Sequence, residues 1–137
     1  MHRSVLQAIA IEKLNDAELL FSNARYSNSY YLFGYAAEIA IKARIAGMFL
    51  PDTIPDRKFV AAVYSHNLND LIGLAGLSGD IKASRDASQI FDGHWATVAD
   101  WNESAGYDVI DIFRSTAMRN AMMDEANGVF GWLQQRW

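Results

Sequence analysis

The chain contains no cysteine and only two prolines among its 137 residues. Without cysteine, disulfide bonds, thiolate metal sites and cysteine nucleophiles are excluded. A chain of this length can bury enough apolar surface to fold without such cross-links. Basic residues are also few: the 12 of them, against 16 acidic residues, give a net charge of -4. This balance disfavours general binding to phosphate backbones and leaves room only for a local basic pocket.

Long uncharged apolar runs are missing too. The longest apolar tract, residues 30–50, contains Glu38, Lys42 and Arg44. Charges at the centre of the tract favour a buried helix over a membrane span. Charged residues at positions 12, 13, 16 and 18 interrupt the N-terminal segment where a signal peptide would be apolar. We therefore expect one globular domain over residues 1–137, located in the cytoplasm and without a membrane anchor.

Hydrophobic side chains recur at steps of three and four in three long segments, which predicts amphipathic helices. The first stripe is Leu6, Ala10, Leu14, Ala17, Phe21 and Ala24. The second is Tyr30, Phe33, Ala37, Ile41 and Ile45, in a helix that is apolar on nearly all sides and is therefore expected to lie between neighbours. The third comprises Phe113, Ala117, Ala121, Met122, Ala126, Val129 and Leu133, in a final helix expected to begin near Asp108.

Capping and breaking residues divide the rest of the chain. Ser27 or Asn28 is expected to cap the second helix, and the two prolines place the main loop at residues 50–58. Asn67 or Asn69 is expected to start a short helix. Another helical stretch is expected from Asp80, with a break at Gly93. Because no alternating strand pattern with a hairpin signal occurs, the sequence predicts an all-α fold, an antiparallel up-and-down bundle of four to five helices.

Common catalytic and cofactor motifs are lacking. The three histidines, at positions 2, 66 and 94, form no short metal-ligand pair such as H-E-x-x-H, so we expect no metal site. No serine lies in a G-x-S-x-G elbow. The glycine-rich segment from Gly73 to Asp80 matches neither a phosphate loop nor a dinucleotide fingerprint. The sequence therefore predicts no catalytic residue and no cofactor.

Two charged residues in the apolar second helix are more informative. Glu38 and Lys42 stand four residues apart and so share one face of the helix. An exposed pair in this order contributes only about 0.2 to 0.5 kcal/mol, too little to explain charges in so apolar a segment. Two interpretations stay open: an internal ion pair that fixes how the helices pack, or the edge of a polar pocket.

Several segments of the sequence resemble the HEPN family, small helical proteins of prokaryotic defence and toxin-antitoxin systems. The second-helix stretch SYYLFGYAAE (residues 29–38) with Lys42-Ala43, preceded by Ala24-Arg25, resembles the family's second-helix signature. The segment HNLNDL (residues 66–71) resembles its H-x-L-x-x-L element. Residues 95–101, from Trp95 to Trp101, resemble its W-x-x-x-x-x-W stretch, which in the family leads to an R-Y pair. Here Gly106 precedes Tyr107 instead. The ending VFGW (residues 129–132) also fits such domains.

The resemblance implies a helical bundle that forms a homodimer, often beside a nucleotidyltransferase-like partner. Active ribonucleases of the family use an arginine and a histidine with four to six residues between them. No arginine in this chain is followed by a histidine at that spacing; Arg57 and Arg85 each precede a histidine by nine positions. A base for the 2'-hydroxyl and a cation for the phosphate are therefore missing from their usual places.

Three functional hypotheses follow. The first is a non-catalytic module that binds a nucleotide or RNA and acts with a partner in toxin-antitoxin control or defence, with aromatic rings against bases and cations on phosphate. Its candidate ligand-binding residues are Tyr31, Tyr35, Glu38, Lys42, His66, Trp101 and Tyr107. The second is a divergent metal-independent ribonuclease that draws on residues such as Arg57, His66, Arg85 or His94. The third is a structural helical dimer in which most of these aromatic residues fill the core.

Overall fold

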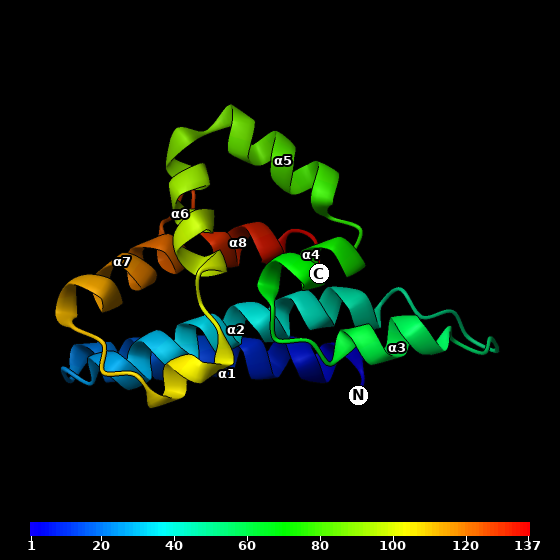
Figure 1. Cartoon of the computed structure of the whole chain (residues 1–137), viewed down its shortest axis with the longest axis horizontal. Helices are drawn as coiled ribbons and strands as arrows, with labels where there is room; N and C mark the ends of the chain where they lie inside the picture. Colours follow the sequence, from blue (N-terminus) through cyan, green and yellow to red (C-terminus); the bar gives the residue numbers. More distant parts are fainter.

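The computed structural model describes all residues, 1–137, and contains only helices (Figure 1). The elements in chain order are α1 (Arg3–Ser22), α2 (Tyr26–Ala46), α3 (Arg57–Val63), α4 (Leu68–Leu74), α5 (Ser78–Ala87), α6 (Gln89–Ala99), the 3-10 helix η1 (Glu103–Tyr107), α7 (Ile112–Met123) and α8 (Val129–Gln134). The all-α prediction is confirmed. The predicted number of four to five helices is wrong. Helix α3 was not predicted and begins at Arg57, inside the predicted loop of residues 50–58, and the predicted final helix is divided into α7 and α8.

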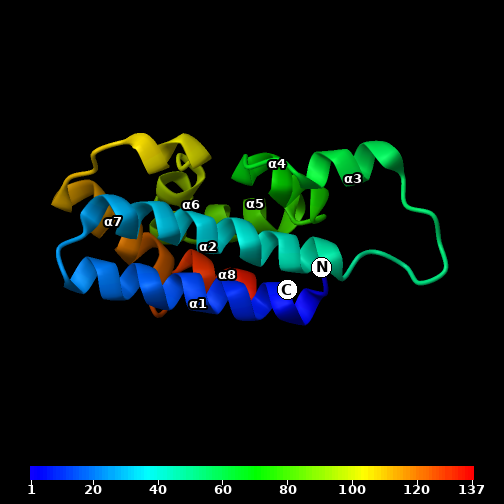
Figure 2. The same ribbon diagram turned by 90° about the horizontal axis from the view of Figure 1, so that it is seen from below.

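Helices α1 and α2 form a long antiparallel hairpin (Figures 1 and 2). Ala10 and Ala17 of α1 are fully buried, and their small side chains let the two helices approach closely. Buried Ser29 of α2 donates its hydroxyl hydrogen to the carbonyl oxygen of Ala17 at 2.8 Å. Ala24 was expected to continue the α1 stripe but lies in the turn with a φ of 59°, a left-handed conformation that costs a residue with a Cβ atom.

Helix α2 is the centre of the fold, as its apolar composition predicts. It packs against α1, α4, α7, α8 and η1, and its five predicted core residues are buried. The expected cap is wrong: α2 begins at Tyr26 and has no side-chain cap. Ser27 instead accepts a hydrogen bond from the backbone N–H of Ile110 at 2.9 Å, which ties the segment before α7 to the start of α2.

Asn67 caps α4 as expected, accepting a hydrogen bond from the backbone N–H of Asp70 at 3.0 Å. The break further along lies at Ser88 and not at Gly93. The Ser88 hydroxyl accepts from the N–H of Phe91 at 3.1 Å and starts α6, whereas Gly93 lies inside that helix. A side chain that satisfies a free backbone donor fixes a helix start, while a single glycine costs only about 1 kcal/mol inside a helix.

The predicted final helix is two helices. Asp111, and not Asp108, caps α7 by accepting from the N–H of Arg114 at 2.8 Å. The turn before α8 is held by Asp124, whose carboxylate accepts backbone hydrogen bonds from Ala126 and Asn127. Because α7 and α8 both pack against α2, the apolar stripe continues across the turn without a continuous helix. None of the helices is long and apolar enough to cross a bilayer.

Candidate functional site

Glu38 and Lys42 of α2 form the pair that their spacing predicts. The Lys42 Nζ atom lies 2.9 Å from Glu38 Oε1, and the side chain of Glu38 is only 2% exposed. Lys42 is partly buried. A carboxylate removed from water in this way depends on its partners for stability, because the low-polarity interior offers no other compensation.

His66 provides the second partner of Glu38. It lies in the turn between α3 and α4, and its Nδ1 atom is 2.9 Å and 3.1 Å from the two carboxylate oxygens of Glu38. Its other nitrogen, Nε2, lies 3.0 Å from Oε2 of Glu103 in η1. Each ring nitrogen of His66 therefore faces a carboxylate, Nδ1 that of Glu38 and Nε2 that of Glu103. The arrangement joins α2, the α3–α4 turn and η1 around one buried carboxylate.

An aromatic cluster adjoins these charges. The ring centroids of Tyr31 and Tyr35 lie 5.8 Å apart, and that of Trp101 is 6.0 Å from Tyr31 and 6.3 Å from Tyr35. Gly34 makes this packing feasible, since a Cβ atom there would lie 2.2 Å from the Trp101 ring. Burial raises the pKa of the Tyr31 hydroxyl above its ordinary value, and the Tyr35 hydroxyl and the charge of Glu38 add to the effect.

Two of the predicted aromatic residues occupy opposite extremes of exposure. Trp101 is 2% exposed, so its ring packs against the two tyrosines inside the protein and presents no free face to a ligand. Its indole Nε1 is buried without a hydrogen-bond partner. Tyr107 at the end of η1 is 94% exposed and forms no aromatic contact with the cluster. The structure therefore brings together Tyr31, Tyr35 and Trp101 as one group and Glu38, Lys42 and His66 as another, with Tyr107 outside both.

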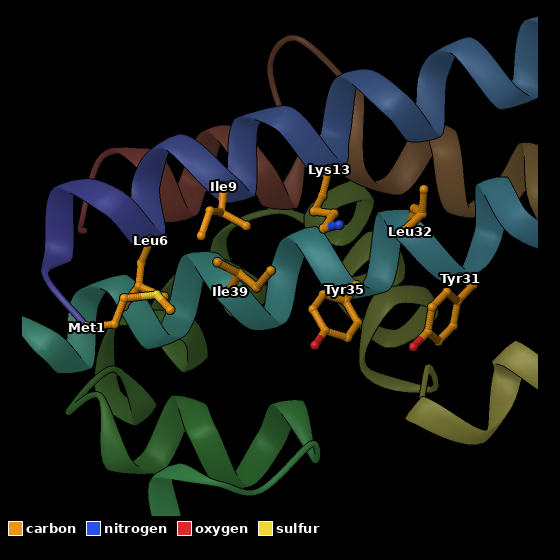
Figure 3. A pocket seen from close by; sticks show the side chains of 8 residues that line it. All are labelled: Met1, Leu6, Ile9, Lys13, Tyr31, Leu32, Tyr35 and Ile39. Atoms are coloured by element: carbon orange, nitrogen blue, oxygen red, sulfur yellow. The ribbon is translucent and has the colours of Figure 1, made fainter.

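A cavity of about 460 Å³ lies along the α1–α2 hairpin beside the tyrosines (Figure 3). Its lining is apolar except for the ammonium group of Lys13 and the hydroxyl groups of Tyr31 and Tyr35: Met1, Leu6, Ile9, Lys13, Tyr31, Leu32, Tyr35 and Ile39. Lys13 forms no ion pair. A volume of this size is within the range of small-molecule pockets.

Sequence reasoning missed Lys13. The signal for it was present in the helical spacing, since Leu6, Ile9 and Lys13 follow one another at steps of three and four and so share one side of α1. A basic residue on an otherwise apolar side of a helix is a reason to expect a cavity at that point. The pairing of Glu103 with His66 was also missed, because nothing in the sequence shows that η1 folds back onto the α3–α4 turn.

The remaining histidines lie elsewhere. His2 caps α1 by accepting from the backbone N–H of Ser4, and His94 of α6 lies 2.9 Å from the carboxylate of Asp124. Hydrogen bonds from His94 and from the backbone lower the pKa of Asp124 below the usual carboxyl value. No three side chains of the histidine, aspartate and glutamate types converge in a geometry that could hold a metal ion.

Comparison of the chain with protein-family models, with curated proteins and with solved structures found no match.

Proposed function

We propose that the protein is a non-catalytic, HEPN-like module that binds a nucleotide or an RNA end in the cavity between α1 and α2. The observation that carries the proposal is the lining of this cavity, where two partly exposed tyrosine rings and an unpaired ammonium group face the same apolar space. A nucleotide presents the matching groups, a flat base that packs on aromatic rings and a phosphate that pairs with a cation.

Of the residues predicted to bind the ligand, only Tyr31 and Tyr35 line this cavity. Lys42 and His66 lie outside its lining and both contact Glu38. Lys13 is therefore the cation expected to contact the phosphate directly. The rings of Tyr31 and Tyr35 are expected to contact the base, and Trp101 is expected to hold Tyr31 in position.

The proposed biological setting rests on the resemblance in sequence. We place the protein in the cytoplasm, as a homodimer that acts with a nucleotidyltransferase-like partner in a toxin-antitoxin or defence system. In that setting the module would present a nucleotide or an RNA end to the partner and would itself break no bond. The missing arginine–histidine spacing supports this non-catalytic role.

Calorimetric titration tests the binding proposal. The four ribonucleoside monophosphates and a short single-stranded RNA are titrated into the protein, and at least one is expected to bind. Lys13→Met is expected to weaken that binding about tenfold, since it removes one charge-assisted hydrogen bond. Lys82→Met is the matched control, because Lys82 is exposed and pairs with Asp86 within α5. Absence of binding by all these ligands would overturn the proposal and favour a purely structural role.

One observation keeps a ribonuclease as the second candidate. His66 is partly exposed and its ring is oriented by Glu38, which is how a general base is often held. Incubation of labelled RNA with the protein in EDTA separates the two functions. The non-catalytic proposal predicts intact RNA, whereas cleavage that disappears in His66→Ala would contradict it.

A further inference from the structure

A second cavity adjoins the one proposed to bind a nucleotide. We call the first the tyrosine cavity and the second, which has a volume of about 490 Å³, the aliphatic cavity. Met1 and Leu6 line both, so the two cavities meet at these side chains. Met1 is 85% exposed, and its unbranched side chain is flexible. It is therefore no fixed barrier between the two spaces.

The aliphatic cavity is lined by the end of α2, by α3 and by residues that follow these helices. Its aliphatic residues from the two helices are Ile45, Ala46, Val60 and Val63. Lys42 is the one charged side chain in the lining, and its ammonium group already pairs with Glu38 at 2.9 Å. A phosphate in this cavity would find no unpaired cationic side chain. The lining therefore suits an uncharged, apolar group.

The unpaired cation lies in the tyrosine cavity, between the tyrosines and the aliphatic cavity. Figure 3 shows Tyr31 toward one end of the tyrosine cavity, Met1 and Leu6 at the opposite end and Lys13 between these ends. Lys13 follows Leu6 by about two helical turns, which corresponds to about 10 Å along the axis of α1. The order along the two cavities is thus aromatic rings, ammonium group and aliphatic lining.

This order determines how the parts of a ligand lie. With a base against the tyrosine rings and a phosphate at Lys13, the phosphate is the part of the nucleotide nearest to the aliphatic cavity. A substituent on that phosphate is directed past Leu6 and Met1. A second nucleoside suits the aliphatic cavity poorly, because its polar ring atoms and hydroxyl groups would lose water and gain few partners there.

We propose that the protein recognises a nucleoside monophosphate that carries an apolar chain on its phosphate, as an acyl nucleotide does. The chain occupies the aliphatic cavity, the phosphate pairs with Lys13 and the base lies against the tyrosines. This inference rests on the proposed nucleotide site and narrows the class of ligand that the site takes. An unmodified mononucleotide fills the tyrosine cavity alone and leaves the aliphatic cavity without a ligand group.

Alkyl esters of the four ribonucleoside 5'-monophosphates test the proposal by calorimetric titration. The methyl and hexyl esters carry the same single negative charge and differ only in the length of the chain. Each buried methylene group strengthens binding by up to about fourfold. For at least one of the four nucleotides, the hexyl ester is therefore expected to bind more tightly than the methyl ester by about tenfold or more.

Two variants locate the chain. Ala46→Phe fills the aliphatic cavity and Val60→Asn makes its lining polar; both residues are partly exposed, so the melting temperature is expected to stay close to that of the parent protein. In both variants the hexyl ester is expected to bind only as tightly as the methyl ester, whose own affinity is unchanged. Ala61→Phe is the matched control, because Ala61 is exposed on α3 and lines neither cavity.

The outcomes separate this proposal from the one on which it rests. Equal binding of the methyl and hexyl esters by the parent protein, or a tighter binding of the hexyl ester that persists in Ala46→Phe and Val60→Asn, would overturn the role of the aliphatic cavity alone. Hexyl phosphate that binds as tightly as the hexyl nucleotides would overturn it too, because the base would then contribute nothing. Failure of the unmodified monophosphates and of all the esters to bind would overturn the nucleotide site itself.

Discussion

The protein contains two imidazole–carboxylate pairs of equal length in two different environments. His66 lies 2.9 Å from Glu38 on the α2 side of the molecule, and His94 lies 2.9 Å from Asp124 at the α7–α8 turn. Glu38 is almost completely buried, whereas Asp124 is partly exposed. The comparison teaches that the length of a contact does not determine its importance for stability. Water can replace a lost partner at Asp124 but not at Glu38.

The partners of the two carboxylates also differ in kind. Glu38 is held by two side chains, Lys42 and His66, from separate parts of the chain. Asp124 accepts two backbone hydrogen bonds within its own turn in addition to the one from His94. The first carboxylate therefore organises a tertiary site next to the tyrosines, while the second shapes a local turn.

The largest expected effect is that of Glu38→Ala. The substitution leaves the partly buried Lys42 without a counter-charge, removes one of the two carboxylates that contact His66 and opens a space in the core. We therefore expect a loss of about 3 kcal/mol in the free energy of unfolding. Chemical denaturation monitored by circular dichroism measures it. Asp124→Ala is the matched substitution in the other region and is expected to cost less. Equal losses in the two variants would contradict the importance given to burial.

Two glycines extend the comparison to backbone packing. A Cβ atom at Gly34 in α2 would lie 2.2 Å from the Trp101 ring, whereas a Cβ atom at Gly93 in α6 would have no neighbouring atom within 4 Å. Gly34→Ala is therefore expected to destabilise the fold by about 1 to 3 kcal/mol, because the indole ring has to move. Gly93→Ala is expected to stabilise it by about 0.5 to 1 kcal/mol through the better helix propensity of alanine.

Thermal melting and near-ultraviolet circular dichroism check the glycine prediction. The near-ultraviolet signal of Gly34→Ala is expected to change because the tryptophan and the tyrosines beside it are rearranged. The signal of Gly93→Ala is expected to match that of the parent protein. A Gly34→Ala variant with an unchanged melting temperature would mean that Trp101 has room to shift and that the aromatic cluster is loosely packed.

The helical class and the role of α2 were predictable because apolar spacing reports directly on which face is buried. The same spacing could not show where helices end. Ser88 caps α6, and Asp124 accepts hydrogen bonds from the backbone of the turn before α8, and these local bonds interrupt helices where the apolar pattern continues. The Glu38–Lys42 pair was predictable because both residues lie on one helix. The contact of His66 with Glu103 and the cavity at Lys13 were not, since they depend on how separate elements fold together.

The smallest expected effect is that of Asp124→Asn, whose cost in stability depends on pH. Hydrogen bonds from His94 and from the backbone lower the pKa of Asp124 in the folded protein relative to the unfolded chain. Such a carboxylate stabilises the fold above its unfolded pKa, and the contribution is lost as pH falls through the folded pKa. Asp124→Asn keeps an oxygen that can accept the backbone bonds but removes the charge. We expect it to be less stable than the parent protein at neutral pH and equally stable in strong acid.

Urea unfolding at a series of pH values from neutral to strongly acidic separates this effect from a general loss of packing. Asp86→Asn is the control, because Asp86 is exposed and pairs only with Lys82 within α5. Its free energy of unfolding is expected to equal that of the parent protein at every pH. If Asp124→Asn is still less stable than the parent protein in strong acid, the loss of stability arises from packing or from the backbone bonds and not from the charge. The contact with His94 would then make no measurable contribution, and the contrast with Glu38 would rest on the buried pair alone.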